Sequence, residues 1–265
     1  MNYCFTLAYN LPSEVEKVTK LLYEQNNPAD FRHLIVDLGF PLETGDTIPS
    51  DYDKAKKENT RKLKELAARF GSDYEAMENI GVSQNWTQVA KFISPGLNDC
   101  LIGCDPDEHP QNRNWVPAVG KVLLREDMGL CSLMMTAHVP QLVNIPHSEG
   151  IVNGVRVYWF PDGSLNWALI GVSGRLLKAI GEIPYPKEAP RYGWIEGAMY
   201  EAMKEHRLGW CVLPDYQVKH TDYELGDEGT SILLRLWKND IIYRLQEIGQ
   251  PSFEQWMTMK REGKL

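Results

Sequence analysis

The sequence predicts an α/β fold in which a mostly parallel central sheet is flanked by helices. Short apolar runs alternate with longer segments of helical periodicity through residues 1–105, and those apolar runs are nearly continuous rather than interrupted at every second position. Strands that are covered by helices on both faces have this composition, and their crossover helices make them parallel. The 265 residues, 43% of them hydrophobic, provide enough apolar material for a sizeable core.

Expected strands and helices alternate along the first half of the chain. Val15, Val18 and Leu22 fall at helical spacing, and a second helix shows the same spacing before a glycine at position 71 that favours a helix end. We expect strands at residues 4–9, 31–39, 74–79 and 99–105, and helices at residues 12–26, 51–70 and 85–94.

The second half is less regular. Residues 161–163 read Pro-Asp-Gly, a turn sequence between two apolar runs, and residues 140–154 are rich in proline, glycine and asparagine, which predicts a loop. We expect helices at residues 115–126, 193–206 and 231–248, and strands at residues 130–137, 154–160, 165–173 and 210–214.

Charge and cysteine content limit the partners and the compartment. The net charge is −8, which disfavours nucleic acid as a partner. The N-terminal residues do not form a signal peptide, and no apolar stretch is long enough for a transmembrane segment. The five scattered cysteines are expected to be core residues rather than a disulfide framework. These features predict a cytoplasmic protein.

Polar residues follow each of the first four expected strands. They are Asn10, Asp37, Asn79 and Asp105. In open parallel sheets, ligands bind at the carboxyl ends of the strands. The sequence therefore predicts a binding site where these four strand ends meet.

The segment DCLIGCDPDEHP contains the strongest local signal. An apolar strand leads to Asp105 and Asp107, and Pro106 restricts the backbone between them. Two such carboxylates can share Mg²⁺ or Mn²⁺ and leave coordination positions open for diphosphate oxygens. The alternative is a solvated acidic turn that caps the next helix. The buried strand before the pair favours the cation, and His109 is expected to be a loop residue.

The chain resembles the GT-A nucleotide-sugar glycosyltransferases, and among them the inverting family 2. The resemblance covers residues 3–222 and rests on six segments in the family's order: LAYN, LIVDLGF, ENIGVSQN, LIGCDPDEHP, YGWIEGAMYEA and YQVKHTD. One departure is Gln84, which stands where the family often has an arginine before the helix asparagine.

The resemblance implies roles for particular residues. The nucleotide would be bound by Ala8, Asn10, Asp37, Asn79 and Asp105, the metal by Asp105, Asp107 and His220, the acceptor by Trp194, and the general base would be Glu196. Each of the last three residues also has a plain structural interpretation: a surface histidine beside Asp222, a core tryptophan, and an acid favoured in the first turn of a helix.

The implied activity is transfer of a sugar from a UDP- or GDP-sugar to a saccharide or other hydroxyl, dependent on Mn²⁺ or Mg²⁺ and inverting. A single GT-A domain is expected over residues 1–265, with a nucleotide-binding half (1–112), an acceptor-binding half (113–250) and a tail (251–265). Two alternatives stay open: a catalytically silent carbohydrate or nucleotide binder, and a metal-dependent phosphohydrolase.

Overall fold

The computed structural model describes residues 1–8, 12–39, 52–136, 147–160, 169–185 and 196–220. Its helices are α1 (Pro12–Gln25), α2 (Tyr52–Phe70), α3 (Val82–Ile93), α4 (Trp115–Leu123), α6 (Gly174–Ile180), α7 (Glu196–Glu205) and the short 3₁₀ helix η1 (Pro28–Asp30). Its strands are β1 (Asn2–Ala8), β2 (Phe31–Asp37), β3 (Asp73–Ala76), β4 (Cys100–Gly103), β5 (Glu108–Pro110), β6 (Met128–Met135), β7 (Ser148–Val152), β8 (Val155–Trp159), β9 (Gly171–Ser173) and β10 (Gly209–His220).

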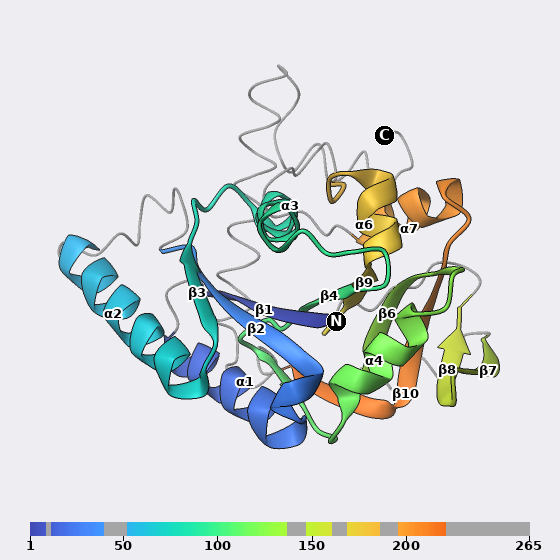
Figure 1. Ribbon diagram of the computed structural model, residues 1–265, viewed down its shortest axis with the longest axis horizontal. Helices are drawn as coiled ribbons and strands as arrows, with labels where there is room; N and C mark the ends of the chain where they lie inside the picture. Colours follow the sequence, from blue (N-terminus) through green and yellow to red (C-terminus); the bar gives the residue numbers. More distant parts are fainter. Residues whose placement is uncertain (9–11, 40–51, 137–146, 161–168, 186–195, 221–265) are drawn as a thin grey trace, which may run out of the picture.

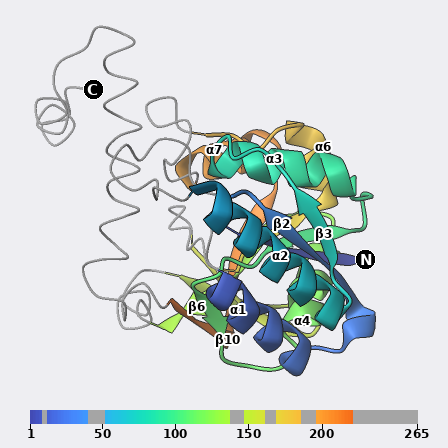
Figure 2. The same ribbon diagram turned by 90° about the vertical axis from the view of Figure 1, so that its left-hand side faces the viewer.

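These strands form one sheet in the order β3-β2-β1-β4-β9-β6-β10-β8-β7, and β5 pairs with β10 beside this path. The pairs β1–β2, β2–β3, β1–β4 and β6–β10 are parallel, whereas β9 lies antiparallel between β4 and β6. Helices α3, α6 and α7 cover one face of the sheet, and α1, α2 and α4 cover the other (Figures 1 and 2). The predicted α/β fold class, a mostly parallel sheet between helices, is confirmed.

Most expected elements are present with shifted ends. Helix α3 begins three residues earlier than expected, α4 ends three residues earlier, and β10 continues to His220 instead of ending at residue 214. The predicted loop at 140–154 is wrong in its second part, because β7 lies there and forms a hairpin with β8. Strand β5 and helix α6 were not expected. The predicted turn at 161–163 and helix at 231–248 lie outside the described residues.

The core on the α3 side is tightly packed where α3 crosses β4. A Cβ atom at Gly103, the last residue of β4, would lie 2.2 Å from Cζ2 of Trp86, which is 1% exposed. The Trp86 ring packs edge-on against Phe5 of β1, with ring centroids 4.6 Å apart. Only glycine therefore allows the helix to approach the strand that leads to Asp105.

Substitution of Gly103 by alanine is expected to lower the free energy of unfolding by about 1–3 kcal/mol, since the added methyl group overpacks a filled core. Chemical denaturation measures this loss. Trp86→Phe in the same chain removes the overlapping atoms, so the double variant should lose less than the sum of the two single variants. Simple additivity of the two losses would show that the overlap is relieved elsewhere.

The five cysteines are free and buried, as predicted, and all belong to the apolar cluster beneath α1 and α4: Cys4, Cys100, Cys104, Cys131 and Cys211. Cys131 and Cys211 stand opposite each other on β6 and β10. Burial raises the pKa of the Cys100 thiol to about 12, and it also raises the pKa values of Cys4 and Cys131. Burial therefore keeps these three thiols in their neutral form.

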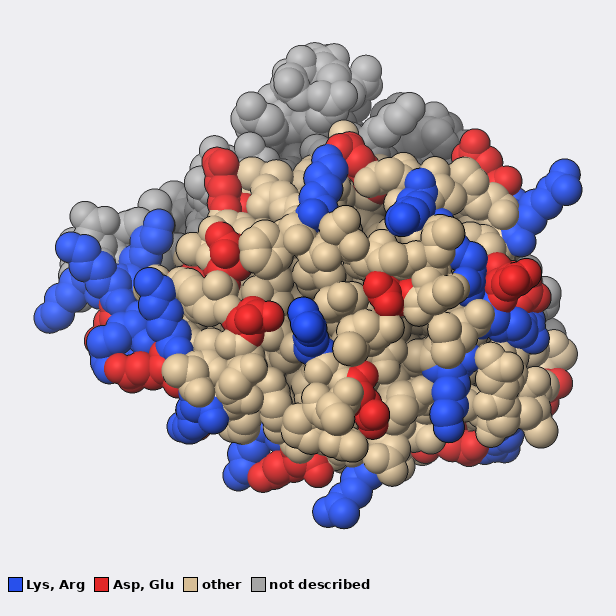
Figure 3. Space-filling model, in the orientation of Figure 1, with Lys and Arg blue, Asp and Glu red and all other residues tan. Residues whose placement is uncertain are grey.

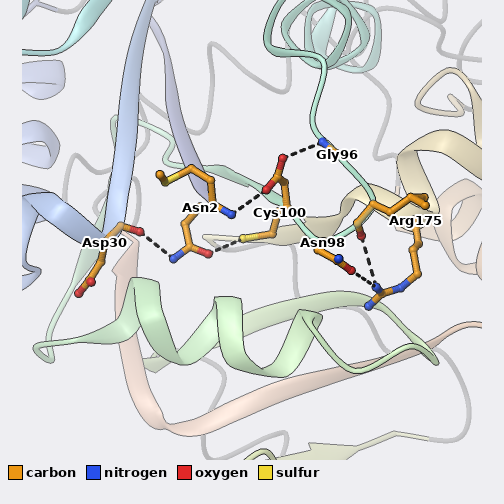
Figure 4. Close-up of polar contacts among 9 residues, drawn as sticks. Asn2, Asp30, Gly96, Asn98, Cys100 and Arg175 are labelled. Atoms are coloured by element: carbon orange, nitrogen blue, oxygen red, sulfur yellow. Dashed lines mark hydrogen bonds and ion pairs between the residues drawn. The ribbon is translucent and has the colours of Figure 1, made fainter.

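Side-chain hydrogen bonds connect several elements at the amino end of the sheet, opposite the carboxyl ends of the parallel strands (Figure 4). The amide of Asn2 donates to the carbonyl of Asp30 (2.9 Å), and its oxygen accepts from Cys100 Sγ (3.0 Å). Arg175 donates to Asn98 Oδ1 (3.4 Å) and to carbonyls at the end of α4. These bonds hold β1, β4 and α6 in one arrangement. Among the described helices, none is long and apolar enough to cross a membrane.

A buried histidine links β1 and β2 to the end of α2. His33 is 3% exposed, with its Nε2 3.1 Å from Thr6 Oγ1 and its Nδ1 2.9 Å from Ser72 Oγ. Burial lowers the pKa of His33 from 6.5 to about 3. The folded protein therefore holds this ring neutral at a pH where the unfolded chain would protonate it.

This depressed pKa makes stability depend on pH in one direction. The contribution of His33 is complete above pH 6.5 and is lost as the pH falls toward 3, by about 1.4 kcal/mol per pH unit. The free energies of unfolding at pH 7.5 and pH 5.0 should differ by about 2 kcal/mol more in the native sequence than in His33→Gln. An identical pH dependence in both proteins would contradict the burial of a neutral His33.

Candidate functional site

The candidate site lies at the carboxyl edge of the sheet. Because β1, β2, β3 and β4 are parallel, their last residues (Ala8, Asp37, Ala76 and Gly103) lie along the same edge. Asp37 is the last residue of β2, and Asn79 and Asp105 follow β3 and β4. The structure therefore brings these three expected residues to one side of the sheet.

The loop after β4 is built around a buried carboxylate. Glu108, 2% exposed, donates its backbone N–H to the carbonyl of Asp105 (3.0 Å), which closes a tight turn through Pro106. Its Oε2 accepts from the backbone N–H of Leu169 (2.8 Å) and, at 3.4 Å, from that of Asp105. Glu108 thus fixes the backbone that carries Asp105 and Asp107, a role that the sequence analysis missed.

Three carboxyl groups are concentrated in this turn. The pKa of Glu108 is raised by burial first, and then by repulsion from Asp105 and Asp107. Asp107 keeps 24% of its side chain exposed. The turn therefore creates a negative potential at a point that solvent can reach, which favours a cation there.

Strand pairing brings a histidine to the same point from far along the chain. Strand β5 runs antiparallel to the end of β10, with Glu108 opposite His220. As a result Nε2 of His220 lies 3.3 Å from Oδ2 of Asp107, and both side chains are about one fifth to one quarter exposed. The structure thus joins two of the three predicted metal ligands, and Asp105 lies in the same turn.

These residues fit a divalent cation. Two ligands at adjacent positions of an octahedron with bonds of about 2.1 Å lie about 3 Å apart, close to the observed 3.3 Å. A carboxylate and an imidazole suit Mn²⁺, and partial exposure leaves room for other ligands. In the described residues, no group of three or more His, Cys, Asp or Glu side chains forms a ready metal cluster. Water or phosphate oxygens would have to complete the coordination.

Asp37, the expected nucleobase contact, has several partners within the protein. Its Oδ1 accepts from the N–H of Gly39 (3.0 Å), and its Oδ2 accepts from Thr60 Oγ1 (2.7 Å) and Tyr74 OH (2.8 Å). Burial and this hydrogen bond to Asp37 raise the pKa of Tyr74. The carboxylate is 7% exposed and held rigidly, so a ligand could add at most a further bond to it. Thr60 and Tyr74 were not expected from the sequence.

Asn79 and Ala8 differ in what they offer a ligand. Asn79 is 4% exposed, and its oxygen accepts weakly from Gly81 N–H (3.4 Å), whereas its Nδ2 has no partner among the described residues. Ala8 is completely buried, and its carbonyl accepts from Leu38 N–H (3.2 Å). Asn79 therefore retains an unused donor, and Ala8 contributes only to the frame of the site.

The structure says less about the other residues that the sequence predicts for the site. Asn10 and Trp194 lie outside the described residues, and Glu196 is the first residue of α7. Arg61 is exposed on α2 and forms ion pairs with Glu58 (2.7 Å) and Glu65 (2.5 Å). Acidic and basic side chains are mixed over the face of the molecule shown in Figure 3.

Solved structures resemble this arrangement of strands and helices. Residues 1–349 of TarS from S. aureus match with a TM-score of 0.56 and 14% identity, over 91% of this chain and 65% of that one. The mannosyltransferase PcManGT from Pyrobaculum calidifontis, in complex with GDP-Man and Mn²⁺, matches with a TM-score of 0.59 and 13% identity, over 93% and 63%. The chain has a GT-A nucleotide-sugar glycosyltransferase fold.

A third GT-A structure is glucosyl-3-phosphoglycerate synthase from Mycobacterium tuberculosis, in complex with Mn²⁺, UDP and glucosyl-3-phosphoglycerate. It has a TM-score of 0.53 and 15% identity, over 96% of this chain and 81% of that one. This chain spans less than two thirds of the first two GT-A structures. No protein-family model and no curated protein matches the sequence.

A divalent cation at Asp107 can be tested without knowing the sugar. We expect UDP or GDP to stabilise the protein when Mn²⁺ is present. At a nucleotide concentration about 100 times the dissociation constant of the nucleotide, the free energy of unfolding should be about 2.7 kcal/mol higher with Mn²⁺ than with EDTA. Asp107→Ala should abolish this difference in a thermal-shift measurement. Its unliganded melting temperature should change little, because the Asp107 side chain is partly exposed.

Asp215→Ala is the matched control, since it removes an exposed carboxylate from β10 that pairs with Arg156. This variant should keep the Mn²⁺-dependent stabilisation. A large loss of unliganded stability in Asp107→Ala would instead give the aspartate a structural role.

Proposed function

We propose that this chain transfers a sugar from a nucleotide-diphosphate donor to the hydroxyl of a saccharide acceptor, with a divalent cation held by Asp107, His220 and Asp105. The proposal is supported most by the approach of His220 to Asp107 to within 3.3 Å at the carboxyl edge of a GT-A sheet. This pair combines an oxygen and an imidazole ligand, although 113 residues separate them in the sequence.

The chemistry expected at this site needs such a pair. A bound divalent cation stabilises the negative charge that develops on a departing diphosphate. Asp107 and His220 would hold that cation, and the buried Glu108 would hold the turn that carries Asp107 through its backbone hydrogen bonds. Asp105 would face the ribose, and the free Nδ2 of Asn79 would donate to the donor substrate.

The acceptor side would be supplied by the second half of the chain. In the inverting reaction, the carboxylate of Glu196 accepts the proton of the acceptor hydroxyl as its oxygen bonds to the anomeric carbon. The bond from that carbon to the diphosphate breaks at the same time. The start of α7 is a favourable position for this base, because the helix dipole stabilises an ionised carboxylate there.

The domain division follows the same proposal. Residues 1–112 would bind the nucleotide, residues 113–250 the acceptor, and residues 251–265 would form a tail. The donors proposed are UDP- or GDP-sugars, the nucleotides named for the similar solved structures.

Substitution of Glu196 by glutamine is expected to lower sugar transfer by about 10²-fold or more, because the amide has nearly the same shape but cannot take the proton. Binding of the donor nucleotide should stay unchanged. Radiolabelled or mass-spectrometric transfer assays with a panel of nucleotide sugars and acceptors measure the first quantity, and calorimetry measures the second.

Glu201→Gln is the control, since Glu201 is an exposed acid on the same helix that pairs with Lys204 (3.2 Å). It should transfer sugar at the unmodified rate. Equal transfer by Glu196→Gln would rule out this base, and release of free sugar or phosphate without transfer would favour a hydrolase. Nucleotide binding with no turnover of any donor would favour a silent binder.

A further inference from the structure

A second concave site lies away from the strand ends, between the β7–β8 hairpin, α7 and the start of β10. It is a cavity of about 460 Å³, within the range of sites that bind small molecules. None of the described residues that line it is Asp, Glu, Lys or Arg, and most have aromatic rings. They are His147, Ser148, Trp159, Phe160, Tyr200, Gly209 and Trp210.

One wall of this cavity is a continuous row of rings. Phe160 stacks on Trp210 with centroids 5.6 Å apart and planes 18° apart, and His147 packs against Phe160 at 5.5 Å. Tyr158 extends the row at 4.4 Å from His147. Phe160 and Trp210 are buried, so they fix the row from below. The row of rings is therefore anchored in the core.

Trp159 forms another part of the wall and is also held in position. The guanidinium of Arg125 lies over its ring, 5.0 Å from the centroid, and Arg125 is itself bound to Asp127. Gly209 faces this ring, and a Cβ there would lie 3.5 Å from Cζ3 of Trp159. The absence of a side chain at Gly209 keeps the space beside the indole open.

The cavity adjoins the helix that begins with the proposed base. Tyr200 is one turn after Glu196 along α7, whereas Trp210 stands ten residues before His220 in β10. The cavity therefore borders the helix that carries the proposed base, and none of its described lining residues is one proposed for the cation. This relation to the acceptor rests on the proposed function.

The side chains that line the cavity indicate what kind of ligand it could bind. None of the described lining residues carries a charge that could pair with a charged ligand, which favours an uncharged one. Flat aromatic faces suit the C–H faces of a sugar ring, and the hydroxyls of Ser148 and Tyr200 lie in the same lining for polar contacts. A sugar combines an apolar face with polar edges in the same way.

We propose that this cavity binds a neutral sugar unit of an oligosaccharide acceptor, one that is not itself the reacting unit. The acceptor of this enzyme is then a chain of sugars and not a single sugar.

Binding can be measured without donor nucleotide or metal, from the fluorescence of the tryptophans. The probes are neutral cello-, manno-, galacto- and chito-oligosaccharides of two to four units. At least one series should bind, and Trp159→Ala should weaken that binding about 10-fold or more. Ser148→Trp fills the cavity from an exposed position, so it should give the same loss without removing a core side chain.

Phe92→Ala is the matched control, because Phe92 is an aromatic residue that is 55% exposed on α3 and does not line the cavity. It should bind the saccharide unchanged, and all three variants should bind UDP with Mn²⁺ unchanged. The proposal is overturned if no series binds, if both cavity variants bind as well as the unmodified protein, or if an apolar dye occupies the cavity and no saccharide displaces it. Saccharide binding that maps to the cavity in a protein with no transfer activity would contradict the proposed function and leave this site standing.

Discussion

The geometry of the candidate site depends on one buried carboxylate, that of Glu108. Its oxygen joins the turn after β4 to the segment that enters β9, and its backbone pairs with the end of β10. Burying a carboxyl group is costly unless hydrogen bonds compensate, so this arrangement persists only because backbone donors are aimed at it. The residues around it are held by contacts between three distant parts of the chain.

The parallel arrangement of the strands explains why the site is at the carboxyl edge of the sheet. Parallel strands bring residues from separate βα units to one side of the sheet, and β10 carries its last residue to the same edge by running parallel to β6. The close approach of α3 to β4 at Gly103 packs the end of the strand from which the acidic turn begins. The position of the acidic turn thus depends on core packing. A few side chains at that position provide the groups that could bind a ligand.

The sequence predicts the first half of the fold well, because β1, β2 and β4 are continuous apolar runs and α1 and α2 have clear helical spacing. It does not predict β5, whose three residues have no periodicity, or β7, which is mostly exposed. In the site, the spacing of Asp105 and Asp107 is visible in the sequence. The bonds of Thr60 and Tyr74 to Asp37 are not, since they depend on how α2 and β3 lie beside β2.

Because every cysteine is buried, the reaction of a cysteine with an added thiol reagent would report local opening of the folded protein. A thiol reagent in water cannot reach Cys4, Cys100, Cys104, Cys131 or Cys211 while the helices stay on the sheet. Each labelling event therefore marks a molecule in which that face has separated, and the five thiols sample β1, β4, the turn after β4, β6 and β10 in turn. The order in which they react would show which strand of this face is exposed first, without any probe having been added to the chain.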